Sequence, residues 1–121
     1  MSKRNDKSNP RLTDLIRLLK QASSENEVQI WRDIAIRLEK PSKNYAEVNV
    51  SKINRYAKEG ETLLIPGKVL GSGVLESKVT VAALNFSDSA ICKIGDRDGQ
   101  CISIEELLAQ NPKGSHVRIL R

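Results

Sequence analysis

Aromatic side chains, cysteine and histidine are all scarce in this 121-residue sequence. One Trp, one Phe and two Tyr are too few for a platform on which unpaired bases stack, so any nucleic-acid binding should rest on phosphate, sugar and folded shape. Two cysteines without a CxxC pair, and one histidine, cannot supply the grouped ligands of a zinc site. We therefore expect no bound metal, and we expect Cys92 and Cys101 to be free, buried, apolar residues.

Long hydrophobic runs are also absent. No stretch approaches the roughly 20 apolar residues that a membrane span needs, and the first segment, MSKRNDKSNPR, has no hydrophobic signal core. The hydrophobic fraction of 39% is ordinary for a globular domain of this length. The sequence therefore predicts a cytoplasmic protein with a modest core.

Groupings of catalytic residues are missing as well. Gly71-Ser72-Gly73 lacks the third glycine of a dinucleotide fingerprint, and Gly67-Lys68 precedes Val69 where a phosphate loop needs Ser or Thr. Both are interpreted as turns. His116 has no accompanying Ser or Cys motif, and Glu105-Glu106 point in different directions, each adding favourable charge at a helix N-terminus. We predict no catalytic residue, no cofactor and no small-molecule substrate.

Basic charge is what the sequence does have. The net charge is +5, and residues 1–45 carry +4 of it against +1 for residues 46–121. Such a basic N-terminal part favours an anionic partner, with a solubilising surface as the alternative. The cations that could follow a nucleic-acid backbone are Lys3, Arg4, Lys7, Arg11, Arg17, Lys20, Arg37, Lys40 and Lys43.

A basic segment interrupted by proline, residues 37–53, carries the strongest local signal. A helix cannot comfortably continue through Lys40-Pro41, so the chain is expected to open into an extended linker there. Its cations are followed by Asn44 and Tyr45, an amide and a ring that can stack. This combination suits phosphates and unpaired bases, while a solvated interdomain linker is the alternative.

Two helices are predicted before this linker, after a flexible basic tail over residues 1–9. Asn9 can cap the first helix, with Pro10 at its first position, and Ser24 with Glu27 has the spacing of a capping box for the second. Residues 10–45 thus form a helical arm and linker. The apolar stripes at helical spacing are Leu12, Leu15, Ile16 and Leu19, then Val28, Trp31, Ile34, Ala35 and Leu38.

Residues 46–121 are expected to form an α/β core. Three short strands run into a serine that can cap a following helix, at Ser51, Ser87 and Ser103, the last in a capping box with Glu106. Further strands are predicted at residues 62–65, 69–70, 78–83 and 117–120. The order of the strands does not follow from the sequence.

Three runs carry a resemblance to a known family: YAEVNVSKINRYAKEGETLLIPGKVLGSG, KVTVAALNFSDSA and CISIEELLAQNPKGSHVRIL. They closely resemble the large-subunit ribosomal protein family called L eighteen e, the archaeal and eukaryotic relative of bacterial protein L fifteen. The similarity covers about residues 10–121. The short length, without eukaryote-type extensions, points to the archaeal branch.

The resemblance implies an α/β (α+β) fold, with a compact core of short irregular β-β-α units preceded by an N-terminal helical arm. It also implies a non-catalytic constituent of the large ribosomal subunit, one copy per ribosome, bound to ribosomal RNA and neighbouring proteins. The RNA contacts that it implies are Arg37, Lys40, Lys43, Asn44, Tyr45 and, in the PGK turn, Lys68.

One departure from the family concerns the linker. Family members often carry more arginine there, whereas this chain has Lys40, Ser42 and Lys43. Lysine offers a point charge instead of a planar fork, so bidentate phosphate contacts are not expected at these positions. The alternative functions are a free-standing RNA- or DNA-binding regulator and a small enzyme that binds a nucleotide near Gly71-Ser72-Gly73.

Overall fold

The computed structural model describes residues 9–121, so the predicted contacts Lys3, Arg4 and Lys7 lie outside the described residues. Helices and strands are mixed along the chain, which confirms the predicted α/β class. The helical arm holds α1 (Pro10–Asn26) and α2 (Gln29–Glu39), followed by one 3-10 turn over Ser42–Asn44. The rest comprises β1 (Ala46–Asn49), α3 (Val50–Tyr56), β2 (Thr62–Leu70), β3 (Thr80–Phe86), α4 (Asp88–Asp96), β4 (Gln100–Ser103), α5 (Ile104–Gln110) and β5 (Val117–Ile119).

All strand pairs in the sheet are parallel, in the order β1-β2-β3-β4, and β5 also pairs with β2. One edge of β2 is shared by two strands, because β5 pairs with its first residues and β1 with its last four. Parallel sheets are stable only when both faces are covered. The chain therefore needs helices on both sides.

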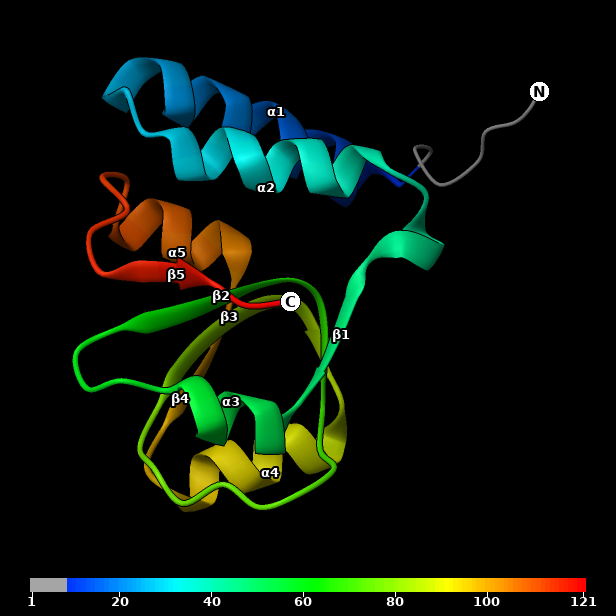
Figure 1. Cartoon of the computed structure of the whole chain (residues 1–121). Coiled ribbons are helices and arrows are strands. Elements are labelled where there is room, and N and C mark those ends of the chain that lie inside the picture. The colour runs from blue at the N-terminus through cyan, green and yellow to red at the C-terminus, as the bar shows by residue number, and fades with distance from the viewer. Residues whose placement is uncertain (1–8) are drawn as a thin grey trace.

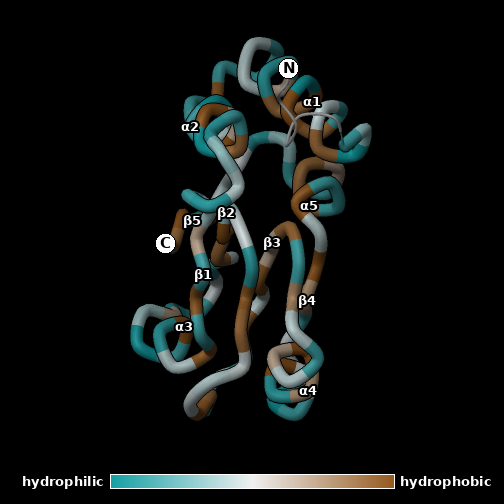
Figure 2. The backbone as a smooth tube through the Cα atoms, turned by 90° about the vertical axis from the view of Figure 1, so that its right-hand side faces the viewer, coloured by the Kyte–Doolittle hydropathy of each residue, from teal (hydrophilic) through white to brown (hydrophobic). Residues whose placement is uncertain are grey.

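Two apolar clusters provide this cover. Leu63 and Ile65 of β2 face α3 and α4, whereas Leu64 faces the cluster built with α1, α2 and α5. Figure 1 shows α1 and α2 above the sheet and α3 and α4 below it, and Figure 2 shows the strands running between these two groups. The predicted apolar stripes of the helical arm are thus buried against the sheet, as a hairpin of marginal helices requires.

Pro66-Gly67 is not the turn between two strands that the sequence predicts. Both residues lie inside β2, at a shift in its register with β3. Proline has no N–H to donate, and it falls where the edge of β2 changes its partner from β5 to β1. Gly67 lies against β1, where an added Cβ would be 1.9 Å from the carbonyl oxygen of Ala46. The residues predicted to form a turn therefore form an irregularity within β2 that lets two strands share one edge.

Two of the predicted helix starts are wrong. The Ser24 capping box does not form, because α1 continues to Asn26 and is closed by left-handed Glu27 (φ 55°), with Val28 N–H donating to the Ser23 carbonyl. Ser51 lies inside α3, one residue past its start, and the side chain of the N-cap residue Asn49 accepts from Ser72 N–H instead. Local spacing could not anticipate either competing contact.

The other caps are confirmed. Asn9 Oδ1 accepts from Arg11 N–H at 3.0 Å at the start of α1, where Pro10 takes the first helical position. Ser87 caps α4 through Ala90 N–H at 3.2 Å. Ser103 and Glu106 form the predicted capping box of α5. Each pair satisfies backbone amides that the first turn of a helix leaves without partners.

Both cysteines are free, as expected, but the expectation that both are buried is wrong. Cys92 is exposed on α4, and Cys101 in β4 is half-buried, where burial raises the pKa of its thiol. No helix in the described part of the chain is long and apolar enough to cross a membrane. Within residues 9–121, no three His, Cys, Asp or Glu side chains gather as metal ligands.

Candidate nucleic-acid interface

Two hollows are lined in part by the linker between α2 and β1, and Ala46 lines both. The first, here called the linker groove, has a volume of about 510 Å³. It is lined by Asn9, Arg11, Leu12, Ser42, Lys43, Tyr45, Ala46, Glu47, Gly67, Lys68, Leu84 and Asn85. The second, here called the arginine hollow, has a volume of about 390 Å³ and is lined by Arg37, Lys40, Asn44, Ala46, Pro66 and Arg121.

The linker itself is more ordered than the extended segment that the sequence predicts. After Pro41 it makes one 3-10 turn, in which Asn44 N–H donates to the Pro41 carbonyl at 2.9 Å and Tyr45 N–H to the Ser42 carbonyl at 3.0 Å. The Tyr45 hydroxyl donates to the Leu38 carbonyl at 2.7 Å, and the ring packs against the cluster beneath α1 and α2. Tyr45 thus holds the linker in place through the end of α2, which leaves only part of its ring to face a partner.

The floor of the linker groove is a row of polar side chains across three strands. Glu47 of β1 is the register partner of Lys68, which in turn is the register partner of Asn85 of β3. Side chains at paired positions point to the same side of a sheet, so these three stand together, and all are exposed. Exposed Lys43 adds a second cation from the turn above. An amide and two cations, offset by one carboxylate, form a surface that suits phosphate and sugar.

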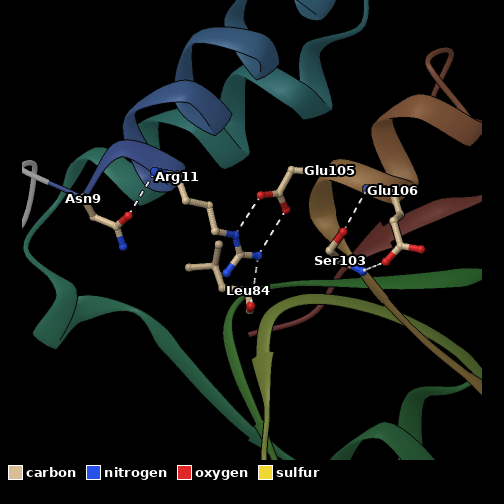
Figure 3. Close-up of polar contacts among 6 residues, drawn as sticks. All are labelled: Asn9, Arg11, Leu84, Ser103, Glu105 and Glu106. Atoms are coloured by element: carbon tan, nitrogen blue, oxygen red, sulfur yellow. Dashed lines mark hydrogen bonds and ion pairs between the residues drawn. The ribbon is translucent and has the colours of Figure 1, made fainter.

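Arg11, which also lines the groove, is already bound to other residues of the protein. Its guanidinium donates to both carboxylate oxygens of Glu105, at 2.8 and 3.1 Å, and to the Leu84 carbonyl at 3.2 Å. Figure 3 shows this contact joining the start of α1 to the start of α5 and the sheet, while Glu106 turns away to Ser103. The hydrogen bonds that Glu105 accepts from Arg11 hold the pKa of its carboxyl below the ordinary value, and donating them raises the pKa of Arg11.

The Arg11–Glu105 contact makes stability depend on acid pH. A carboxyl whose pKa is lowered on folding stabilises the protein at any pH above its ordinary pKa, near 4.3. This contribution is lost as the pH falls through the lowered pKa of the folded state. Glu105→Gln should therefore cost about 1 kcal/mol at pH 7, since the pair is bidentate but partly exposed, with 44% and 33% of its side chains accessible. The loss should shrink below pH 4.

Urea unfolding of Glu105→Gln and the unchanged protein between pH 3 and 7 measures this dependence. Exposed Glu59→Gln is the matched control and should give a free energy of unfolding parallel to that of the unchanged protein at every pH. A Glu105→Gln deficit as large at pH 3 as at pH 7 would show that the carboxylate charge is not what stabilises the contact.

The structure brings together some of the predicted site residues and separates others. Arg11, Lys43, Tyr45 and Lys68 meet in the linker groove, and Arg37, Lys40 and Asn44 in the arginine hollow. Arg17 and Lys20 line neither hollow. Arg17 is 3.9 Å from Asp14, and Lys20 is 2.6 Å from Glu39, which links α1 to α2. These two cations form part of the helical surface.

Asn85 and Arg121 also line the hollows, but the sequence did not predict them as site residues. Asn85 could have been found only from the register of β3 against β2, which places it beside Lys68. Arg121 follows β5 and reaches the linker because β5 pairs with β2. Neither pairing leaves a local signal in the sequence.

The glycine-rich segment Gly71-Ser72-Gly73 is built around a cation of the protein itself. Lys93 Nζ donates to the carbonyl oxygens of Gly71 and Gly73 at 2.6 Å each, and Ser72 N–H donates to Asn49 Oδ1 at 3.3 Å. A phosphate loop turns backbone amides toward its ligand. Here the carbonyls converge on Lys93 instead, which argues against a nucleotide site there.

The chain is similar to known proteins of a single family. Over residues 1–121 the chain matches the family described as ribosomal protein 60S L18 and 50S L18e. A protein of Methanospirillum hungatei named large ribosomal subunit protein eL18 is 76% identical over 121 residues, the full length of both chains. Its namesake in Methanoregula boonei is 66% identical over the full length of both, and that in Haloarcula marismortui is 53% identical over 115 residues, covering 95% of this chain and 98% of that one.

Proposed function

Because the chain belongs to the family of ribosomal proteins 60S L18 and 50S L18e, we propose that it braces large-subunit ribosomal RNA through the linker groove. The protein is a structural constituent of the large ribosomal subunit, and the resemblance drawn from its sequence is confirmed. Its role is non-catalytic and cytoplasmic. Its partners are ribosomal RNA and neighbouring ribosomal proteins, and one copy serves each subunit.

The observation that carries the proposal is the convergence of Lys43, Lys68 and Asn85 from three separate segments of the chain. Cations release counterions when they neutralise phosphates, and this supplies affinity without reading bases. The side-chain amide of Asn85 can donate to a phosphate or accept from a ribose hydroxyl. Scarce exposed rings fit the same conclusion, since folded RNA is bound mainly through its backbone and shape.

Rigid walls let the groove position RNA as well as attract it. Arg11 fixes the start of α1 to α5 and the sheet, and the Tyr45 hydroxyl fixes the linker to α2. RNA segments repel one another, so a rigid cationic surface that neutralises their phosphates stabilises one relative arrangement. The protein thus acts as a brace in subunit assembly and in the finished particle.

Lys43→Ala/Lys68→Ala tests the proposal. Binding to deproteinised large-subunit ribosomal RNA should weaken about a hundredfold, because two charge-assisted contacts are lost and each contributes about 1.5 kcal/mol. The slope of log affinity against log salt should fall by about 1.5, at roughly 0.7 to 0.9 per phosphate contact. The melting temperature should hardly change, since both side chains are exposed.

Exposed Lys58→Ala/Lys113→Ala removes the same charge outside both hollows and is the matched control. Equal losses of affinity in the two double variants would show that the groove contributes only general electrostatic attraction to RNA binding. Sedimentation through a salt-washed sucrose gradient separates the free-standing regulator from the ribosomal constituent. The regulator would leave the large subunits, whereas the ribosomal constituent should stay with them.

A further inference from the structure

The arginine hollow shares only Ala46 with the lining of the groove just described. Its cations come from three parts of the chain: Arg37 from the last turn of α2, Lys40 from the linker, and Arg121 from the segment after β5. Asn44 adds an amide, and Ala46 and Pro66 form its apolar wall. Its lining holds no acidic side chain, in contrast to Glu47 in the linker groove.

The main evidence for a ligand in the hollow comes from Arg37. Its Nε atom is buried and has no hydrogen-bond partner among the described residues. A donor that is removed from water and left without an acceptor is costly, and such an atom in a native protein calls for an explanation. A bound anion would supply the acceptor, and the planar fork of a guanidinium matches two oxygens of one phosphate.

Three backbone oxygens near the hollow already accept hydrogen bonds from the protein. Lys52 Nζ donates to the main-chain oxygen of Arg121, so a cation occupies that oxygen. The carbonyl of Leu38 at the end of α2 is taken by the Tyr45 hydroxyl, and that of Arg37 by Lys40 N–H at 3.4 Å. The free carbonyls of a helix end would repel an anion, and here two of them are already used.

We infer that the arginine hollow is a second, separate pocket for a phosphate of the RNA backbone, with Arg37 as its anchor and Arg121 as its second arm. This inference rests on the proposed function, because the phosphate belongs to the RNA that the groove binds. With one backbone contact in each hollow, the linker is held by two phosphates. Arg121, which the sequence did not mark, becomes part of the interface.

A helix-stabilising role for Arg37 is the competing explanation, because a cation in the last turn favours the helix dipole. Arg37→Lys separates the two. It keeps the charge and hence the effect on the helix end, but it loses the fork and the buried Nε donor. A stability like that of the unchanged protein, together with weaker RNA binding, supports the pocket. Unchanged binding with lower stability overturns it.

Inorganic phosphate probes the pocket without RNA. In ¹H–¹⁵N spectra of arginine side chains, the Nε–H signal of Arg37 should shift with phosphate to saturation, and that of exposed Arg32 on the same helix should not. The shift should persist in Lys43→Ala/Lys68→Ala, because the two hollows are separate. Parallel shifts of both arginine signals would overturn the pocket.

Ribosomal RNA provides the second readout. Arg37→Gln/Arg121→Gln should lower the salt slope of binding by about 1.5, roughly 0.7 to 0.9 per lost phosphate contact, and Arg32→Gln should lower it by clearly less. If Lys43→Ala/Lys68→Ala weakens binding while Arg37→Gln/Arg121→Gln does not, the pocket is refuted and the proposed function stands. If the unchanged protein does not bind ribosomal RNA at all, the proposed function fails, and the assignment of the phosphate to RNA fails with it.

Discussion

Gly67→Ala is expected to lower the free energy of unfolding by about 3 kcal/mol and to weaken RNA binding at the same time. The added methyl group would sit 1.9 Å from the carbonyl oxygen of Ala46 and 2.7 Å from its nitrogen. Both are backbone atoms, so no side chain can turn aside and β1 must move away from β2. Because Ala46 lines both hollows, this movement displaces the linker from Lys68 on one side and from Arg121 on the other.

Thermal unfolding followed by circular dichroism measures the loss, which corresponds to a fall in melting temperature on the order of 10 °C. Gly95→Ala is the matched control, since that glycine lies in α4 with nothing within 4 Å of an added Cβ. It should be neutral or slightly stabilising, because alanine suits a helix better than glycine. A Gly67→Ala protein as stable as Gly95→Ala would show that β1 and β2 do not approach as described.

Trp31→Ala should destabilise the protein by about 3 to 5 kcal/mol, the range for a large buried side chain cut back to a methyl group. Trp31 has no exposed surface and lies in the cluster that joins α1, α2 and α5 to the sheet. Its Nε1–H donates to the Pro112 carbonyl at 2.8 Å, which fixes the loop between α5 and β5. The substitution therefore removes packing and also frees the segment that leads to Arg121.

Trp31→Phe divides the two contributions. It keeps most of the apolar ring and loses the donor, so it should cost clearly less than Trp31→Ala, with about 1 kcal/mol from the hydrogen bond. Urea unfolding followed by circular dichroism is the suitable measurement, because Trp31 is the single tryptophan and its fluorescence is lost in both variants. Equal losses for the two variants would show that the ring packing contributes little.

Much of the fold follows from local sequence signals. Asn9 with Pro10, and Ser103 with Glu106, predicted helix starts that the structure confirms. These devices act within four residues, so they are legible without knowledge of the fold. Ser24 failed because a left-handed residue, Glu27, closes the preceding helix three residues later. A capping pattern is reliable only where no neighbouring helix continues through it.

Less of the candidate site could be predicted from the sequence. The basic composition of residues 37–45 indicated the linker, and both hollows flank it. Cations of equal promise by sequence have different neighbours in the structure, since Arg11 is paired with Glu105, 94 residues away, and Lys20 with Glu39. Exposed Lys43 and Lys68 have no such ion pair in the described part of the chain. Pairing between distant residues decides which charges face a partner.

By itself, the sequence determined the family, the α/β class and the basic linker of the proposed interface, because these depend on composition and on residues near one another in the chain. Only the tertiary structure decided that the linker lines two hollows, and that Asn85 and Arg121 line them too. These positions depend on the pairing of β2 with β1, β3 and β5. Such pairing is set by the burial of both faces of the sheet at once, and no single segment of the chain contains that information.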